Sequence, residues 1–131
     1  PLARFAGEVL GLEGAGAMIR RGQHNAALAG LSNSRFVEAN LAGAGVEGAW
    51  TRERFDLVLL DPPRTGAAEL LPGLGKLAAR RIVYVSCHPG TLARDAGLLV
   101  REHGFRLTSA GVMDMFPHTS HVESMALFER R

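Results

Sequence analysis

Short strand-like segments alternate with helix-like segments along most of this chain, and this alternation limits the possible fold more than any other feature. Strand-like segments are expected over Val9–Glu13, 35–38, 55–60 and 81–85. Helices are expected over residues 17–29, ended by Gly30, over residues 67–79, and over residues 91–103, ended by Gly104. This order predicts an α/β protein with a mostly parallel sheet and helices on its faces. Residues 55–60 are almost all apolar, which indicates a strand buried on both faces.

The C-terminal part departs from this alternation, because residues 105–115 and 122–129 both have strand character with no helix between them. They are expected to pair antiparallel, as a hairpin at one edge of the sheet, joined by residues 116–121. Residues 42–51 are rich in small side chains and predict a loop with a weak helical turn. With 131 residues and no repeats or linkers, the chain is expected to form one domain with one core.

Composition excludes several classes of protein. The chain holds 1 cysteine, which by itself cannot form an internal disulfide or a cysteine-ligated zinc or iron–sulfur site. A chain without disulfides fits the reducing cytoplasm, which is the expected location. No apolar run approaches the roughly 20 residues of a membrane helix, so no membrane association is expected. With 15 basic and 13 acidic residues, the net charge of +2 permits an anionic partner but does not require one.

Side chains that can carry chemistry follow the expected strands. Cys87 comes just after residues 81–85, where a helix is about to begin, and Asp61 comes directly after residues 55–60. In open α/β sheets, ligands and reactive groups lie at the carboxyl ends of the strands. A thiol and carboxylates at such ends indicate covalent catalysis, with Cys87 as the candidate nucleophile. By position alone, a lone cysteine after an apolar strand is more often a small buried hydrophobic residue.

A series of motifs follows one order along the chain: Gly11-Leu12-Glu13-Gly14, Gln23-His24-Asn25-Ala26, Glu38-Ala39-Asn40-Leu41, Phe55-Asp56 through Asp61-Pro62-Pro63-Arg64, Ile82-Val83-Tyr84-Val85-Ser86-Cys87, Thr91-Leu92-Ala93-Arg94-Asp95, and Asp114-Met115-Phe116-Pro117-His118-Thr119. The series resembles the RNA (uracil-5-)-methyltransferases, and within that family the 23S ribosomal RNA uridine-1939 type. The resemblance covers nearly the whole chain but only the family's C-terminal catalytic domain. It implies the Rossmann-like fold of class I S-adenosylmethionine-dependent methyltransferases.

The chain departs from the family pattern in two respects. His88 stands where the cysteine motif usually has asparagine, which changes the reach and donor pattern of a polar side chain. The family's first strand and glycine-rich turn are expected upstream of Pro1, together with an RNA-binding domain and a cysteine-ligated iron–sulfur domain. Residues 1–131 are therefore expected to be a partial catalytic domain that lacks the first strand. The unpaired sheet edge where that strand belongs is a candidate site of self-association.

The resemblance implies transfer of a methyl group from S-adenosylmethionine to C5 of a uridine in 23S ribosomal RNA, without a metal. Cys87 would add to C6 of the base, which makes C5 nucleophilic, and Glu123 would later remove the C5 proton. Without the family, Glu123 is read as an ordinary exposed glutamate at the start of an edge strand. The target base would be flipped out of its loop and stacked in the pocket.

Three residues are the cofactor-binding candidates that the resemblance implies. Glu13 ends the first strand and would accept hydrogen bonds from the ribose hydroxyls, although a charge at a helix N-terminus is the structural alternative. Asn40 would lie near the adenine or methionine part of the cofactor. Asp61 would face the methyl-transfer centre, although its Asp-Pro-Pro turn has a purely structural alternative, because proline makes the chain rigid.

Other interpretations stay open. An amino-group nucleic-acid methyltransferase has an aromatic residue after Asp-Pro-Pro, whereas Arg64 takes that place here, and such chemistry needs no cysteine. A cytosine-C5 enzyme would have a further cysteine where Pro63 stands. A catalytically silent fragment is the alternative from another class. Arg64 is a candidate contact for RNA phosphate, and His118 and His121 are candidates to line the pocket of Cys87 and Glu123. For all three, the structural alternative is an ordinary solvated surface residue.

Overall fold

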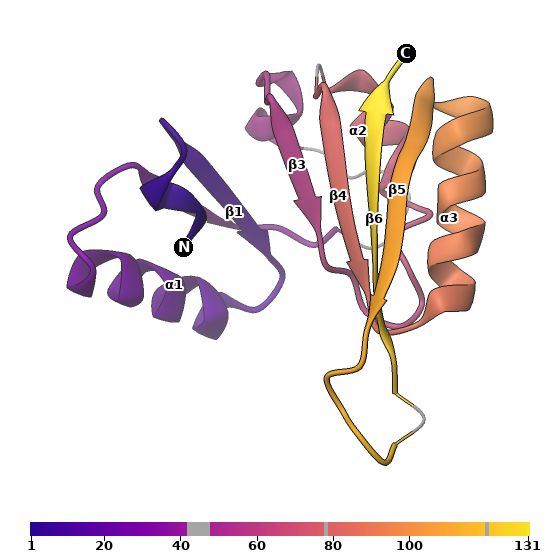
Figure 1. Ribbon diagram of the computed structural model, residues 1–131. Coiled ribbons are helices and arrows are strands. Elements are labelled where there is room, and N and C mark those ends of the chain that lie inside the picture. The colour runs from indigo at the N-terminus through magenta and orange to yellow at the C-terminus, as the bar shows by residue number, and fades with distance from the viewer. Residues whose placement is uncertain (42–47, 78, 120) are drawn as a thin grey trace. The chain divides into compact units, whose positions relative to one another are not determined.

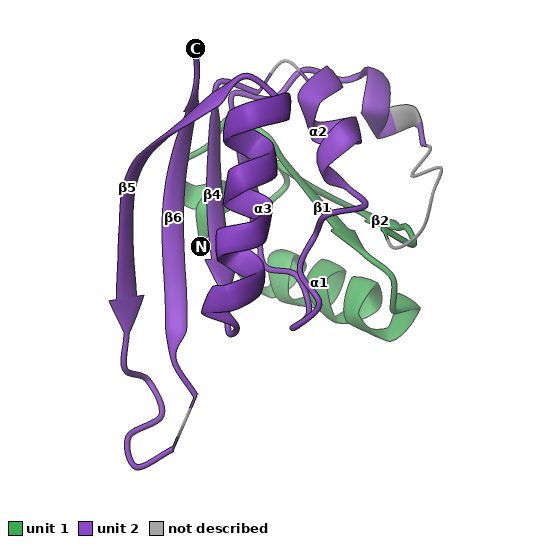
Figure 2. Ribbon diagram, turned by 90° about the vertical axis from the view of Figure 1, so that its right-hand side faces the viewer, with its two compact units in different colours: residues 1–43 green, residues 44–131 purple. Residues whose placement is uncertain are grey.

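The structure, a computed structural model, describes residues 1–41, 48–77, 79–119 and 121–131. Its elements are η1 (Leu2–Arg4), β1 (Val9–Glu13), α1 (Gly16–Leu28), β2 (Ser34–Glu38), η2 (Ala49–Arg52), β3 (Leu57–Leu60), α2 (Leu71–Lys76), β4 (Arg81–Ser86), α3 (Pro89–Glu102), β5 (Phe105–Met113) and β6 (Glu123–Arg130) (Figure 1). Contacts between residues divide the chain into two units, Pro1–Gly43 and Ala44–Arg131, drawn green and purple in Figure 2.

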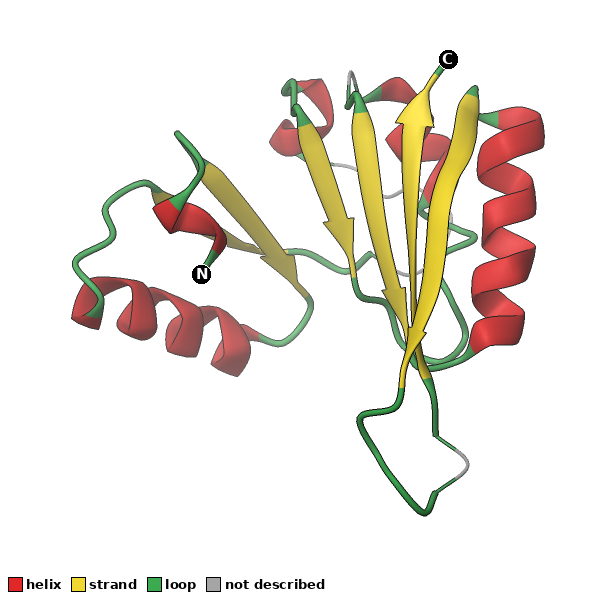
Figure 3. Ribbon diagram, in the orientation of Figure 1, coloured by secondary structure: helices red, strands yellow, loops and turns green. Residues whose placement is uncertain are grey.

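The first unit is a strand–helix–strand motif. β1 and β2 pair in parallel, from Val9 opposite Ser34 to Glu13 opposite Glu38, and α1 connects them (Figure 3). The helix ends as the sequence predicts, because Gly30 has φ +65°, a left-handed conformation that glycine adopts without strain. The ring of Phe36 lies against Gly22 of α1, where an added Cβ would come within 2.8 Å of it. The missing side chain thus lets helix and sheet approach closely.

The second unit is built on a four-stranded sheet with the order β3-β4-β6-β5. β3 and β4 are parallel, whereas β6 runs antiparallel to both of its neighbours. The expected hairpin of the two last strands is confirmed, with β5 at the edge of the sheet. The last strand of the chain, β6, therefore lies between β4 and β5. This arrangement carries the start of β6 to the end of β4.

The core of the second unit lies between this sheet and the helices α2 and α3, which cover the same face of it (Figure 2). Alternate residues of β4 and β6 point into this core, and the ladder places Ile82 opposite Phe128 and Tyr84 opposite Ala126. The helices contribute Leu71, Leu74, Leu92 and Leu99, all buried. Burial of these side chains is the main force that stabilises the unit.

Two expectations about this unit are wrong. The strand expected over residues 55–60 is shorter and is not buried on both faces, because Leu57 and Leu59 are 44% and 47% exposed. In the described part of this unit, helices cover only the face that carries Leu60, and β3 is the outermost strand. The helix expected over residues 67–79 is a single short one, α2, which follows a turn and ends before Leu77 takes an extended conformation.

The remaining elements lie close to their predicted bounds. The helix expected over residues 91–103 is α3, followed by Gly104 with φ +72°. The weak helical turn expected within residues 42–51 corresponds to η2, while residues 42–47 lie outside the described residues. Among the described helices, none has the length and apolar character needed to cross a lipid bilayer. A single domain over residues 1–131 stays a prediction.

Candidate active site

Cys87 lies in a tight turn between the end of β4 and the start of α3. The side chain of Ser86, which is fully buried, fixes this turn, because its Oγ lies 3.1 Å from both the amide nitrogen and the carbonyl oxygen of His88. The hydroxyl can therefore accept from the amide and donate to the carbonyl. Cys87 is free and partly exposed. The turn presents the thiol at the carboxyl end of the sheet, as the sequence predicts.

His88 is the N-cap of α3. Its Nδ1 accepts a hydrogen bond from the amide of Thr91 at 3.2 Å. Asparagine is among the preferred N-cap residues because its side-chain oxygen accepts in the same way. The replacement of the family's usual asparagine by histidine thus keeps an acceptor at the start of the helix. This role needs Nδ1 without a proton.

Glu123 lies next to Cys87 across the sheet, although the two are far apart in the sequence. The antiparallel ladder pairs Ser86, the last residue of β4, with Ser124, and the Ser124 hydroxyl donates to the Ser86 carbonyl at 3.0 Å. Cys87 and Glu123 are each one residue beyond this pair, at the same end of the sheet. Glu123 is partly buried and is also paired with Met113 of β5. The fold therefore brings the two candidate catalytic residues together.

Asp61 lies at the same end of the sheet, because it follows β3, the parallel neighbour of β4. It is exposed and begins a loop of residues 61–67, the 61–67 loop, which precedes α2. The guanidinium of Arg64 in this loop lies 3.3 Å from Nδ1 of His121, so it can donate a hydrogen bond to the loop that precedes β6. The His121 ring also meets Phe116 edge to face, with centroids 6.3 Å apart. Three loops that carry predicted site residues thus meet at one end of the second unit.

Asp95 on α3 is a buried carboxylate that belongs to the Thr91–Asp95 motif, although the sequence alone assigns it no role of its own. It is fully buried and accepts hydrogen bonds from the Tyr84 hydroxyl at 2.6 Å, the Ala67 amide at 2.7 Å and the Arg94 Nε at 2.8 Å. Burying a charged group is costly unless it is paired and hydrogen-bonded, and here both oxygens have donors. The residue lies on the apolar stripe of α3, between Leu92 and Leu99. A carboxylate on the apolar face of a helix is the sequence signal that predicts buried hydrogen-bond donors around it.

The Tyr84 phenol makes folding of this chain sensitive to alkaline pH. Burial raises the pKa of Tyr84 above its usual range, and the hydrogen bond to Asp95 raises it further. The unfolded chain gives up this proton near pH 10, whereas the folded chain keeps it. We expect the free energy of unfolding to be unaffected by this group below about pH 10 and to fall above it, by up to about 1.4 kcal/mol per pH unit.

Urea unfolding between neutral and strongly alkaline pH measures this dependence, and Tyr84→Phe is the control. Tyr84 is the only tyrosine, so its phenolate absorbance follows the titration without interference. At neutral pH the free energy of unfolding of the variant should be lower by about 1–3 kcal/mol, because the buried Asp95 loses a donor. Above about pH 10 its free energy of unfolding should fall less steeply with pH. An equal decline in both proteins would assign the alkaline sensitivity to other groups.

The predicted cofactor residues Glu13 and Asn40 belong to the first unit. Both are exposed; Glu13 is the last residue of β1, and Asn40 follows the parallel strand β2 at the same end. Glu13 Oε1 accepts a hydrogen bond from the Ala15 amide at 2.9 Å, and the Glu13 carbonyl accepts from the Ala39 amide at 3.0 Å. The fold therefore brings these two residues to one edge, as expected for residues that follow neighbouring parallel strands.

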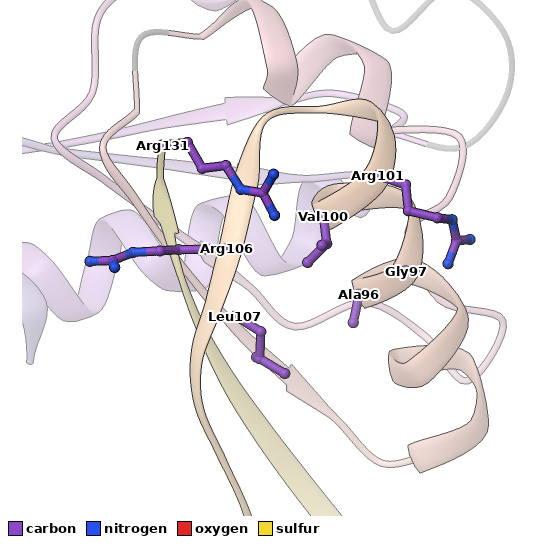
Figure 4. A pocket seen from close by; sticks show the side chains of 7 residues that line it. All are labelled: Ala96, Gly97, Val100, Arg101, Arg106, Leu107 and Arg131. Atoms are coloured by element: carbon purple, nitrogen blue, oxygen red, sulfur yellow. The ribbon is translucent and has the colours of Figure 1, made fainter.

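Two other features lie outside this arrangement. In the described part of the chain, no group of three or more His, Cys, Asp and Glu side chains could hold a metal ion. A shallow hollow lies between α3 and the start of β5 (Figure 4). The strand ladders place it at the opposite end of the sheet from Cys87. It is lined by Ala96, Gly97, Val100, Arg101, Arg106, Leu107 and Arg131. None of the predicted site residues contributes to it.

Comparison with known proteins agrees with this arrangement. The family model for tRNA (Uracil-5-)-methyltransferase matches residues 1–131. The 23S rRNA (uracil(1939)-C(5))-methyltransferase RlmD of Alkalilimnicola ehrlichii is 61% identical over 130 residues, which make up 99% of this chain and 29% of that relative. The protein of the same name from Xanthomonas oryzae is 57% identical over 131 residues, 100% of this chain and 30% of the relative. The chain thus spans less than a third of the length of these relatives.

A solved structure matches as well. The Pyrococcus abyssi tRNA (uracil-54, C5)-methyltransferase, in complex with S-adenosyl-L-homocysteine, superimposes with a TM-score of 0.79 and 34% identity, covering 97% of this chain and 30% of that one. The fold is that of a part of the Rossmann-like, S-adenosylmethionine-dependent methyltransferases. The chain belongs to the tRNA (uracil-5-)-methyltransferase family.

Proposed function

We propose that the protein containing this chain transfers a methyl group from S-adenosylmethionine to C5 of a uridine in 23S ribosomal RNA, through a covalent adduct with Cys87. The observation that carries the proposal is that Cys87 and Glu123 each lie one residue beyond the Ser86–Ser124 pair, at the same end of the β4–β6 ladder. The relatives named above support the choice of RNA. The proposed domain is residues 1–131 as part of a catalytic domain, and the proposed location is the cytoplasm.

Cys87 acts on the base before methyl transfer. C5 of uracil is a weak nucleophile, and addition of the Cys87 thiolate to C6 breaks the C5–C6 double bond and moves its electron pair onto C5 and O4. A thiolate suits this step because it adds readily and also leaves readily. The turn that ends β4 holds Cys87 directly before His88, the N-cap of α3.

Glu123 acts after the methyl group has arrived. S-adenosylmethionine would supply an electrophilic methyl group, which C5 would take up as the bond from that methyl group to the sulfonium sulfur breaks and S-adenosylhomocysteine leaves. C5 then carries a methyl group and a hydrogen, and the Glu123 carboxylate accepts that hydrogen as a proton. The C5–C6 double bond re-forms as the bond from C6 to the Cys87 sulfur breaks. The product is 5-methyluridine, and Cys87 returns to its starting state.

The strand-end residues fit the cofactor in their chemistry. Glu13 is exposed and its Oε1 accepts from the Ala15 amide, so the second carboxylate oxygen can accept from ribose hydroxyls. Asn40 at the same edge offers an amide for the adenine or methionine part. Asp61 follows β3, the parallel neighbour of β4, and Cys87 follows β4. In this proposal Asp61 faces the methyl-transfer centre.

The test measures the product. The full-length protein is incubated with S-adenosylmethionine and unmodified 23S ribosomal RNA, and the digested RNA is analysed for methylated nucleosides by mass spectrometry. We expect 5-methyluridine at one site. An N-methylated nucleoside would instead support the amino-group reaction. Failure of the folded protein to form any methylated nucleoside would support a catalytically silent role.

A further inference from the structure

We infer that Arg94 and Asp95 of α3 are positioning residues that hold the 61–67 loop at a fixed distance from Cys87. The inference rests on the proposed function, because it concerns the geometry of methyl transfer at that site. It gives a role to the Thr91-Leu92-Ala93-Arg94-Asp95 motif, which the proposed mechanism does not use.

Side chains of α3 bind three residues of the 61–67 loop through their backbone. Thr91 Oγ1 donates to the Arg64 carbonyl at 3.1 Å, and Arg94 Nη2 donates to the Thr65 carbonyl at 2.8 Å. Asp95 Oδ2 accepts from the Ala67 amide at 2.7 Å. Each contact lies between residues 27 to 29 positions apart in the sequence. The helix thus holds the backbone of the loop in place, and not merely the side chain of one loop residue.

Gly66 shows how closely the loop approaches the helix. Its φ of +84° lies in the left-handed region, and an added Cβ would lie 2.5 Å from Arg94 Nη2 and 2.6 Å from Asp95 Oδ2. Glycine is therefore required here both for its conformation and for the space. On either side of Gly66, the Thr65 carbonyl accepts from Arg94 and the Ala67 amide donates to Asp95.

Asp95 and Arg94 also hold each other. Arg94 Nε and Nη2 both lie within 2.8 Å of Asp95 Oδ1, while Nη2 reaches on to Thr65. Asp95 is anchored from the sheet by the Tyr84 hydroxyl. A buried carboxylate with donors on both oxygens is rigid, because any displacement leaves a buried polar group unpaired. The loop is therefore connected to β4 and α3 through groups that move little.

The same helix sets the position of Cys87, because its N-cap His88 follows the nucleophile directly. α3 thus connects the turn of the proposed nucleophile to the loop that begins at Asp61 and holds Arg64. Methyl transfer needs the reacting atoms in near-attack geometry, and a misplacement of about 1 Å can cost about 10²-fold in rate. Loosening this connection should slow the chemical step more than it weakens binding.

Arg94→Gln tests the inference, because the Arg94 side chain is half exposed and its replacement should not unfold the protein. In the full-length protein we expect the single-turnover rate of uridine methylation, at saturating S-adenosylmethionine and RNA, to fall about tenfold. The RNA and cofactor concentrations at half-saturation should change little. Hydrogen exchange at the Ala67 amide should become faster. Arg94→Lys, which keeps a cation beside Asp95, should recover part of the rate.

Arg101→Gln is the matched control, since Arg101 is an exposed arginine on the same helix that lines the hollow at its far end. It should leave the rate and the Ala67 exchange unchanged. A merely structural role of Arg94 would lower the unfolding temperature and leave the methylation rate at 25 °C as in the unchanged protein. That result, with unchanged Ala67 exchange, would overturn the inference.

The two proposals fail in different ways. If the unchanged protein forms no 5-methyluridine, the proposed function is wrong, and the Ala67 exchange still decides whether Arg94 holds the loop. If the unchanged protein is active and Arg94→Gln is equally active, only the positioning role is wrong. Should Arg94→Gln not fold, Thr91→Val removes a single hydroxyl from the same contact set, and its rate must then fall by a smaller factor.

Discussion

Replacing Cys87 with alanine is expected to abolish uridine methylation without disturbing the fold. The thiol is partly exposed, and the turn around it is fixed by Ser86 and His88, which the change leaves in place. Without the thiolate, C5 has no route to a nucleophilic form. We therefore expect the single-turnover rate to fall by at least about 10³-fold, measured as 5-methyluridine formed in 23S ribosomal RNA.

The covalent step can be tested directly with RNA that carries 5-fluorouridine. Fluorine cannot leave as a cation, so the adduct between Cys87 and C6 cannot be resolved and should remain as a protein–RNA band under denaturing conditions. Cys87→Ala should give no such band. Cys87→Ser, which keeps a hydroxyl of similar shape, should also give none, because an unactivated hydroxyl is a poor nucleophile. A band with Cys87→Ala would show that another residue attacks the base.

The parts of the fold that the sequence predicts well are those with clear local signals. α1 and α3 are each followed by a glycine with positive φ, at Gly30 and Gly104, and the strand β1 has the predicted bounds. Local signals also place Cys87 and Asp61 after parallel strands. The position of Cys87 in a turn depends on Ser86, whose role as the group that fixes the turn is visible only in the structure.

The parts that the sequence does not predict depend on neighbours far away along the chain. An apolar strand is read as buried on both faces, but the exposure of Leu57 and Leu59 is decided by which elements cover β3. Glu123 comes to the end of the sheet where Cys87 lies only because β6 pairs with β4, and hydrophobic periodicity contains no information on strand order. The role of Glu123 therefore rests on the family resemblance and stays a prediction.

Replacing Glu123 with glutamine is expected to trap the reaction after methyl transfer. Glutamine has nearly the size of glutamate and keeps its place on β6, but its amide cannot accept the C5 proton. General bases contribute typically about 10²–10⁴-fold, and we expect multiple turnover to slow by a factor in this range. A denaturing gel should show natural, unfluorinated RNA attached to the protein, in an amount that does not exceed one RNA per protein.

Glu129→Gln on the same strand is the matched control. The Arg106 guanidinium lowers the pKa of the Glu129 carboxyl, with a further contribution from Arg81, and all three side chains lie at the other end of the sheet from Cys87. Replacing Glu129 with glutamine should leave turnover unchanged and give no attached RNA. The contrast between two glutamates of one strand separates a change of charge on β6 from the loss of a base at the site.

The order of events makes the Glu123→Gln result decisive. Addition of Cys87 and transfer of the methyl group both precede the removal of the C5 proton, so a variant that lacks only the base must still methylate once and must still hold its RNA. A variant with a distorted site would instead fail at the first step and leave no attached RNA. Because the Ser86–Ser124 pair fixes both strands beside the two residues, glutamine should leave the first step intact. Normal turnover by Glu123→Gln would mean that a different group accepts the proton.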